Sequence, residues 1–262
     1  MIDYSLHPVL IEVLWILNIQ FSKEACPPYY FMYKNGCIMY IYLNPQYVIR
    51  NENNCSYIIA KSALITAKLE YAMAFASVVP PSIGYILSHI GEGELNASIE
   101  NIANTLNIKP DLIDKFIRKI IDNPVKVGWN YKGVTISFPP YLLTSVKEES
   151  EGSVYTDNEL FYTTDFIPKR PSVPLNLNFM ITTQCRTDCM YCYADRNRKN
   201  DLTSWQIIKV IDEAHDMGGN LALTGGDIFA FPDWKEVIRK VGQYGFTPLL
   251  STKIPLKEDD IY

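Results

Sequence analysis

The chain has 262 residues and a net charge of −5, and 48% of its residues are hydrophobic while 20% are charged. This composition excludes a disordered polypeptide, and the length is enough for two ordinary domains. The negative charge argues against a protein devoted to nucleic acid, because phosphate binding requires a basic surface. No segment is apolar for long enough to span a membrane, and the start of the chain lacks the positive charge of a signal peptide, so we expect a cytoplasmic protein.

Three of the six cysteines, Cys26, Cys37 and Cys55, are scattered near the start of the chain. They do not form the dense framework of a small disulfide-bonded secreted domain, so we expect free and partly buried thiols in a reducing compartment. Residues 8–19 predict a packed amphipathic helix. The Asn35-Gly36 pair within residues 29–48 predicts a β-hairpin, whereas residues 56–79 fit either a helix or strands.

Three helices and a second hairpin are predicted next. The helices cover residues 82–91, residues 98–106 with Ser98 as the N-cap, and residues 110–121 with Pro110 at the start. Alternating apolar residues on either side of Lys132-Gly133 predict two paired strands. Three helices and a two-stranded hairpin define a winged helix-turn-helix that follows a small sheet, and we assign residues 1–146 to this N-terminal domain.

Residues 147–174 begin with a polar run and are then punctuated by prolines, which predicts an interdomain linker. The remaining residues, 175–262, alternate strand and helix. Strands are predicted at 175–182, 221–223 and 247–251, with one helix opened by a capping box at Thr203 and another after Pro232-Asp233. This order predicts an α/β domain with parallel strands and right-handed crossovers.

Three thiols, those of Cys185, Cys189 and Cys192, lie in one short loop after the first of these strands. Gly225-Gly226 follows the next strand, and parallel α/β folds place their sites at these strand ends. Three clustered thiolates suit an iron–sulfur cluster with one iron left open. A zinc site with His215 as the fourth ligand, redox chemistry of the Cys189 and Cys192 pair, and incidental core thiols are the alternatives.

The cysteine triplet, with Tyr191 directly before its last member, resembles that of the radical S-adenosylmethionine (radical SAM) superfamily. Gly225, Gly226 and Asp227, at the end of the next strand, resemble the Gly-Gly-Glu motif of the same superfamily, with an acidic side chain one methylene shorter. The order of strand, cysteine loop, helix, strand and glycine pair also matches. The resemblance implies a partial parallel (β/α) radical SAM barrel in residues 175–262.

The resemblance implies two cofactors, a [4Fe-4S] cluster on Cys185, Cys189 and Cys192, and S-adenosylmethionine on its open iron. Reductive cleavage of S-adenosylmethionine would give a 5'-deoxyadenosyl radical, with a flavodoxin or ferredoxin as electron donor. The resemblance also implies a cofactor-binding set, in which the two glycines admit the methionine end, Asp227 meets its ammonium group, the backbone at Tyr191 faces the adenine, and hydroxyls bind ribose or carboxylate. This set is Tyr191, Gly225, Gly226, Asp227, Ser251 and Thr252.

The region from residue 29 to residue 139 resembles the peptide-recognition domain of radical SAM enzymes that mature ribosomal peptides, including those with additional C-terminal clusters (SPASM type). The resemblance implies that the leader of a precursor peptide adds a strand to the sheet edge. A domain that only supports the barrel and a DNA-reading winged helix are the alternatives. The third helix mixes Lys109, Lys115, Arg118 and Lys119 with aspartates, which is a poor surface for phosphate.

We therefore expect a radical SAM peptide maturase, with a non-enzymatic iron–sulfur winged-helix regulator as the alternative function. A complete radical SAM barrel has six strand–helix units, and only about three fit into residues 175–262. We expect a fragment, a truncated product or a barrel completed by a partner chain. Open strand edges of a half barrel predict poor solubility or self-association.

Overall fold

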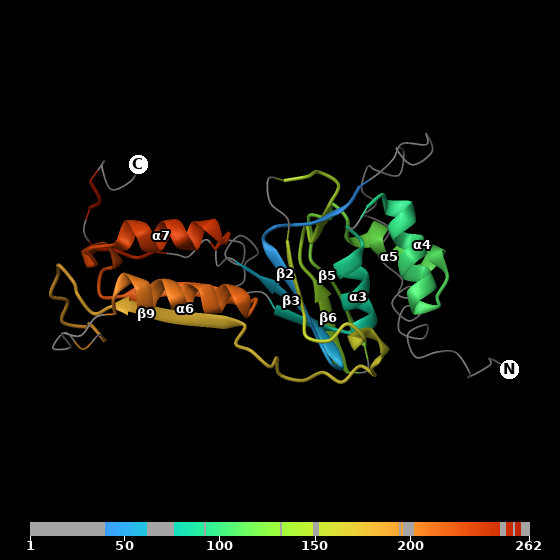
Figure 1. Ribbon diagram of the computed structural model, residues 1–262, viewed down its shortest axis with the longest axis horizontal. Coiled ribbons are helices and arrows are strands. Elements are labelled where there is room, and N and C mark those ends of the chain that lie inside the picture. Colours follow the sequence, from blue (N-terminus) through green and yellow to red (C-terminus); the bar gives the residue numbers. More distant parts are fainter. Residues whose placement is uncertain are drawn as a thin grey trace. The chain divides into compact units, whose positions relative to one another are not determined.

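A computed structural model describes residues 40–61, 76–91, 93–131, 133–148, 152–193, 195, 202–246, 250–253 and 255–257. The chain divides into two compact units, residues 1–59 with 75–172, and residues 60–74 with 173–262 (Figure 1). Helices and several small sheets occur in the described residues, so the predicted mixed α/β class is confirmed at that level. No helix in the described ranges is both long and apolar enough to cross a membrane.

Four strands form the main sheet of the first unit in its described part, in the order β4-β3-β2-β8. They are β2 (Tyr47–Glu52), β3 (Cys55–Ala60), β4 (Ala76–Val79) and β8 (Ser153–Thr156). Strands β3 and β4 pair antiparallel, whereas β2 and β8 pair parallel. Every residue of β2 and β3 is buried, so these two strands form the centre of the unit. A shorter antiparallel pair joins β1 (Tyr42–Leu43) to β7 (Leu143–Thr144).

Several predictions for the start of the chain lie outside the described residues. These are the helix at residues 8–19, the hairpin around Asn35-Gly36, and the state of Cys26 and Cys37. The ambiguous segment 56–79 contains β3 and β4, with residues 62–75 between them outside the description. Cys55 is buried and forms no disulfide, as expected for a free core thiol.

Three helices follow β4 in the first unit: α3 (Pro81–His89), α4 (Leu95–Leu106) and α5 (Pro110–Ile120). Pro81 and Pro110 occupy first-turn positions, where the missing N–H of proline costs no helical hydrogen bond. The predicted Ser98 cap is wrong, because α4 begins at Leu95 and Ser98 is buried inside the helix, where its N–H donates to Glu94 O at 2.9 Å. Asn107 ends α4 in the left-handed conformation that asparagine tolerates.

The predicted hairpin is formed by β5 (Val127–Tyr131) and β6 (Val134–Phe138), which pair antiparallel. Gly133 has φ +82° in the turn, and its N–H donates to Asn130 Oδ1 at 3.0 Å. Phe138 of β6 packs against Phe116 of α5 with ring centroids 5.4 Å apart, so the hairpin shares a core with the helices. The backbone N–H of Ser137 also donates to Ser77 Oγ of β4 at 3.0 Å.

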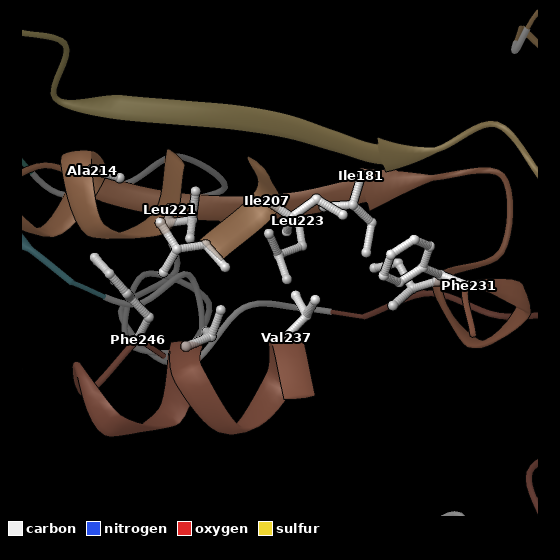
Figure 2. Packing of buried hydrophobic residues seen from close by; sticks show 11 residues of the cluster. Ile181, Ile207, Ala214, Leu221, Leu223, Phe231, Val237 and Phe246 are labelled. Atoms are coloured by element: carbon white, nitrogen blue, oxygen red, sulfur yellow. The ribbon is translucent and has the colours of Figure 1, made fainter. Parts of the chain in front are cut away.

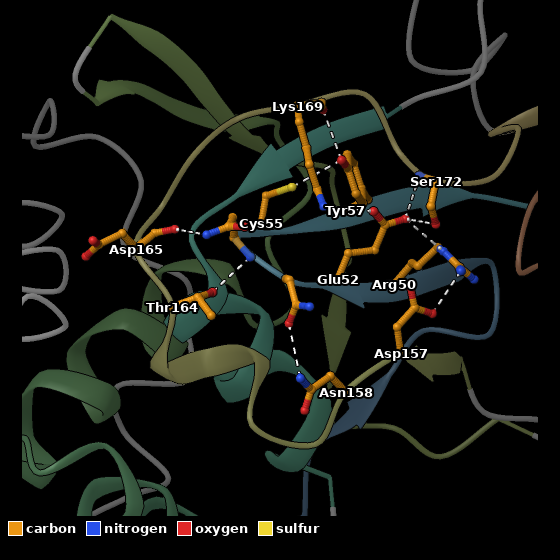
Figure 3. Close-up of polar contacts among 12 residues, drawn as sticks. Arg50, Glu52, Cys55, Tyr57, Asp157, Asn158, Thr164, Asp165, Lys169 and Ser172 are labelled. Atoms are coloured by element: carbon orange, nitrogen blue, oxygen red, sulfur yellow. Dashed lines mark hydrogen bonds and ion pairs between the residues drawn. The ribbon is translucent and has the colours of Figure 1, made fainter.

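Most of the predicted linker, residues 147–174, is a folded part of the first unit. It contains β8 and the 3-10 turn η2 (Phe161–Thr163), and residues up to Ser172 belong to that unit. Its polar residues bind polar groups of β2 and β3, as Figure 3 shows: Arg50 pairs with Asp157 at 3.0 Å, and Glu52 accepts both the N–H and the hydroxyl of Ser172. The polar composition therefore reflects a hydrogen-bonded edge rather than a solvated tether.

The second unit contains β9 (Asn176–Thr182), α6 (Ser204–Asp216), β10 (Asn220–Gly225), the 3-10 turn η3 (Ile228–Ala230) and α7 (Trp234–Gln243). Strands β9 and β10 pair parallel, as the strand–helix–strand order predicted. The predicted capping box is present, since Thr203 Oγ1 accepts the N–H of Gln206 and the Gln206 side chain accepts the N–H of Thr203. Gly218 follows α6 with φ +65°, a conformation that favours glycine.

The core of the second unit is made of apolar side chains from both strands and both helices. Figure 2 shows Ile207 of α6, Leu221 and Leu223 of β10, and Val237 of α7 gathered in one buried cluster. Residues 247–249, the first part of the predicted third strand, lie outside the described residues, and Leu250 and Ser251 lie in no strand. Helices α6 and α7 are also joined by an ion pair of Asp212 with Lys240 at 2.8 Å.

Candidate functional site

The C-terminal ends of β9 and β10 lie side by side, because the two strands pair parallel from Asn176 and Asn220 to Thr182 and Gly225, with a register shift between Thr224 and Gly225. Backbone hydrogen bonds continue beyond the strands. Gly226 N–H donates to Thr182 O at 2.9 Å, and Asp227 N–H donates to Gln184 O at 2.7 Å. The segment that leads into the cysteine loop is therefore fixed directly against the glycine pair.

Gly225 and Gly226 are required by this close approach. A Cβ at Gly226 would lie 2.1 Å from Gln184 O, and one at Gly225 would lie 2.8 Å from Thr182 O. The absent side chains thus admit the backbone that follows β9. This is a different partner from the bound methionine that the resemblance implied for the two glycines.

A cavity of about 350 Å³ opens beside these strand ends. Its size falls in the range of roughly 300–1,000 Å³ that is common for small-molecule sites. All nine residues predicted from the sequence as ligands or binding groups line this one cavity. They are Cys185, Cys189, Tyr191, Cys192, Gly225, Gly226, Asp227, Ser251 and Thr252.

The three thiols of the loop are reduced and accessible to different degrees. Cys185 and Cys189 are half-buried, Cys192 is exposed, and none of them forms a disulfide. A turn brings the last two together, because Cys192 N–H donates to Cys189 O at 3.1 Å. The hydroxyl of Thr187 lies 3.2 Å from Cys185 Sγ and 3.6 Å from Cys189 Sγ. The loop thus presents three thiols, not buried core side chains.

The cavity offers sulfur donors to a metal group. As the described side chains stand, no three His, Cys, Asp or Glu residues are close enough together to hold a metal ion. Three thiols on the wall of one cavity nevertheless have the right chemistry for iron or zinc. The described lining holds no fourth cysteine and no histidine. The described lining therefore supplies three thiols and, in Asp227, one carboxylate as possible donors to a metal group.

His215, the alternative fourth ligand, lies elsewhere in the second unit. Its ring stacks on Tyr244 with centroids 3.9 Å apart, and its Nδ1 lies 3.2 Å from Asp216 Oδ1. It does not line the cavity. Nearby, hydrogen bonds from Lys240 and Tyr244 lower the pKa of Asp212, so the polar groups around His215 link α6 and α7 instead of forming a ligand site.

Asp227 is held by contacts from three directions. Its side chain is only 3% exposed, and one carboxylate oxygen, Oδ2, accepts from Arg186 at 3.3 Å and from Thr252 Oγ1 at 3.2 Å. The other oxygen accepts the N–H of Phe229 at 3.1 Å and so caps η3. Asp227 therefore joins the cysteine loop, through Arg186, to the segment after α7, through Thr252.

Sequence reasoning missed several residues of the site. Thr187, Tyr193, Thr224 and Lys253 also line the cavity. The hydroxyl groups of Tyr193 and Thr224 lie within hydrogen-bond distance, at 2.9 Å. Each missed residue is next to a predicted one, or one position further, so adjacency to the motifs was the available signal. By contrast, Tyr191 was predicted and is 78% exposed at the rim.

No protein-family model matches the chain, and no curated protein sequence matches it. Among solved structures, the chain is similar to the crystal structure of Streptococcus suis SuiB bound to precursor peptide SuiA, with a TM-score of 0.51 and 12% sequence identity. The match covers 84% of this chain and 44% of the SuiB chain, so the chain spans less than half the length of SuiB. At this identity the similarity shows a shared fold.

Proposed function

We propose that the chain is part of a radical SAM enzyme that modifies a peptide. The observation that carries the proposal is the convergence of three cysteines that form no disulfide and the Gly-Gly-Asp segment on one cavity at the ends of two parallel strands. A packing role does not require exposed thiols, and a redox pair does not require the third cysteine. The fold similarity to SuiB supports the same reading.

In this proposal Cys185, Cys189 and Cys192 hold a [4Fe-4S] cluster. Bound there with S-adenosylmethionine, the cluster would supply one-electron reductive cleavage and a 5'-deoxyadenosyl radical, using a flavodoxin or ferredoxin as donor. The chain's own residues bind and orient the cofactor. Asp227, Ser251 and Thr252 offer oxygen atoms to its polar groups, and Tyr191 forms the rim at the adenine end.

The structure of β9, α6, β10 and α7 would be the first part of a parallel (β/α) barrel. In the first unit, α3, α4, α5 and the β5–β6 hairpin would form a winged helix next to a small sheet. We propose that this unit recognises a precursor peptide, since the solved structure of similar fold is bound to one. The leader of the peptide would add to an edge strand of the sheet, β4 or β8, through main-chain hydrogen bonds.

The test is anaerobic reconstitution of the 262-residue chain with iron and sulfide. We expect a [4Fe-4S] signal in electron paramagnetic resonance after reduction by dithionite, and a change in that signal when S-adenosylmethionine is added. Single Cys→Ala substitutions at positions 185, 189 and 192 should each abolish the cluster. Cys55→Ala, which removes a buried thiol of the first unit, is the matched control and should retain it.

Two results would overturn the proposal. One is a cluster whose signal is indifferent to S-adenosylmethionine, which would fit the iron–sulfur regulator instead. The other is stoichiometric zinc and no cluster in the reconstituted wild-type chain.

A further inference from the structure

Thr187 lies in the cysteine loop, between two of the three thiols. Its hydroxyl oxygen is 3.2 Å from Cys185 Sγ and 3.6 Å from Cys189 Sγ, both within hydrogen-bond reach for sulfur. Thr187, Cys185 and Cys189 are all half-buried, whereas Cys192 is exposed. A hydrogen bond to either of the first two sulfurs is therefore partly protected from competition by water.

The direction of this hydrogen bond depends on the state of the sulfur. A thiol can donate to the hydroxyl or accept from it, but a thiolate has no proton and can only accept. Once the cysteines are deprotonated to hold a metal group, the sulfur can only accept, so the Thr187 hydroxyl must donate in either contact. It carries a single proton, so it serves the nearer sulfur, that of Cys185, or is shared with Cys189.

We infer that Thr187 is a positioning residue whose hydroxyl hydrogen bond to Cys185 raises the reduction potential of the iron–sulfur cluster. The inference rests on the proposed function. A donor beside a thiolate stabilises negative charge, and one-electron reduction adds negative charge to the cluster and its sulfurs. The Thr187 hydroxyl therefore favours the reduced form over the oxidised form, and no bond of the protein forms or breaks in the step.

The experiment is a potentiometric titration of the reconstituted 262-residue chain with dithionite and mediators, followed by electron paramagnetic resonance. Thr187→Val keeps the side-chain shape and removes the hydroxyl, whereas Thr187→Ser keeps the hydroxyl and is the matched control. We expect reduction of the Thr187→Val cluster to be about tenfold less favourable, a shift of about 59 mV to more negative potential for one electron. The Thr187→Ser potential should equal that of the wild type.

The outcomes separate this inference from the proposed function. A wild-type chain that assembles no cluster overturns both. Loaded clusters with equal potentials in the wild type and Thr187→Val overturn the inference alone. Thr187→Ala provides a second hydroxyl-free variant. Loss of the cluster from both hydroxyl-free variants, with Thr187→Ser still loaded, would make the hydroxyl an assembly requirement and would also overturn the tuning role.

Discussion

Glu52 in the first unit and Asp227 in the second are similar buried carboxylates with different surroundings. Glu52 is 2% exposed and accepts from Arg50 at 3.3 Å and from the Ser172 hydroxyl at 2.7 Å. Asp227 is 3% exposed and likewise accepts from an arginine and a hydroxyl. The difference lies in the partners. The Arg50 side chain is 7% exposed, whereas Arg186 is 43% exposed and belongs to the cysteine loop.

A buried carboxylate with an arginine and a hydroxyl therefore does not by itself mark a functional site. The partners of Glu52 hold residues 157–172 on the sheet of the first unit (Figure 3), and they do not line the cavity of the second unit. The partners of Asp227 lie beside a cavity lined by three cysteines that form no disulfide. The thiols and the cavity, not the carboxylate, distinguish the second site.

The largest expected effect is on the Glu52 network. Glu52→Ala removes one ion-pair partner of the buried Arg50 guanidinium, which keeps its pair with Asp157, and it removes both hydrogen bonds to Ser172. Breaking a buried ion pair costs about 3–5 kcal/mol, and because Asp157 remains we expect about 3 kcal/mol of lost stability in the first unit. Urea unfolding by circular dichroism, with hydrogen exchange on β2 and β8, measures this loss. Glu52→Gln keeps an acceptor for Ser172 and should lose less.

The next effect concerns the backbone contact behind the cavity. Gly226→Ala places a methyl group 2.1 Å from the Gln184 carbonyl oxygen, so the segment before the cysteine loop must move, at a cost of about 1–3 kcal/mol. Gly242→Ala in α7 is the matched control, since nothing lies within 4 Å of its new methyl group. Alanine there should stabilise the helix by up to about 1 kcal/mol. A lower melting temperature for Gly226→Ala and a higher one for Gly242→Ala, each relative to the wild type, support the contact. Equal shifts in melting temperature contradict it.

Local signals predicted the second unit well. The Thr203 capping box, the apolar runs of β9 and β10 and the spacing of Cys185, Cys189 and Cys192 are each contained in a few consecutive residues. The parallel pairing then follows from chain order alone. These signals were sufficient to place the cysteine loop and the glycine pair at neighbouring strand ends, but not to predict every residue of the cavity, such as Thr187 and Lys253.

Contacts between distant residues were not predictable in the same way. Residues 147–174 were interpreted as a linker because the partners of Asp157 and Ser172, which are Arg50 and Glu52, are more than a hundred positions away in the sequence. Ser98 was interpreted as a cap because the preceding turn of α4 was not recognised. The contact of Arg186 with Asp227 depends on the direction of a long side chain, which spacing does not determine.

Acid should weaken the Glu52 network. Burial alone would raise the pKa of Glu52, but hydrogen bonds from Ser172 and Arg50, with the charge of Arg50, outweigh burial and hold its pKa below the ordinary value. A lowered pKa in the folded state adds stability that is fully present above the ordinary value of about 4.5 and is lost as the pH falls through the folded-state pKa. We expect the difference in urea midpoint between the wild type and Glu52→Gln to shrink below pH 4.5. A difference that is constant from pH 7 to pH 3 would contradict this assignment.

The smallest effect is expected at Arg186. Because this side chain is 43% exposed, water replaces it in Arg186→Ala, and Asp227 retains its contacts with Thr252 and the N–H of Phe229. An ion pair with one solvated partner contributes roughly 0.2–1 kcal/mol, so the melting temperature should fall by no more than a few degrees. Arg186→Lys keeps the charge, so its melting temperature should lie between those of the wild type and Arg186→Ala. A loss as large as that of Glu52→Ala would mean that Arg186 is held as rigidly as Arg50, and the contrast between a structural network and an open site would then rest on the thiols alone.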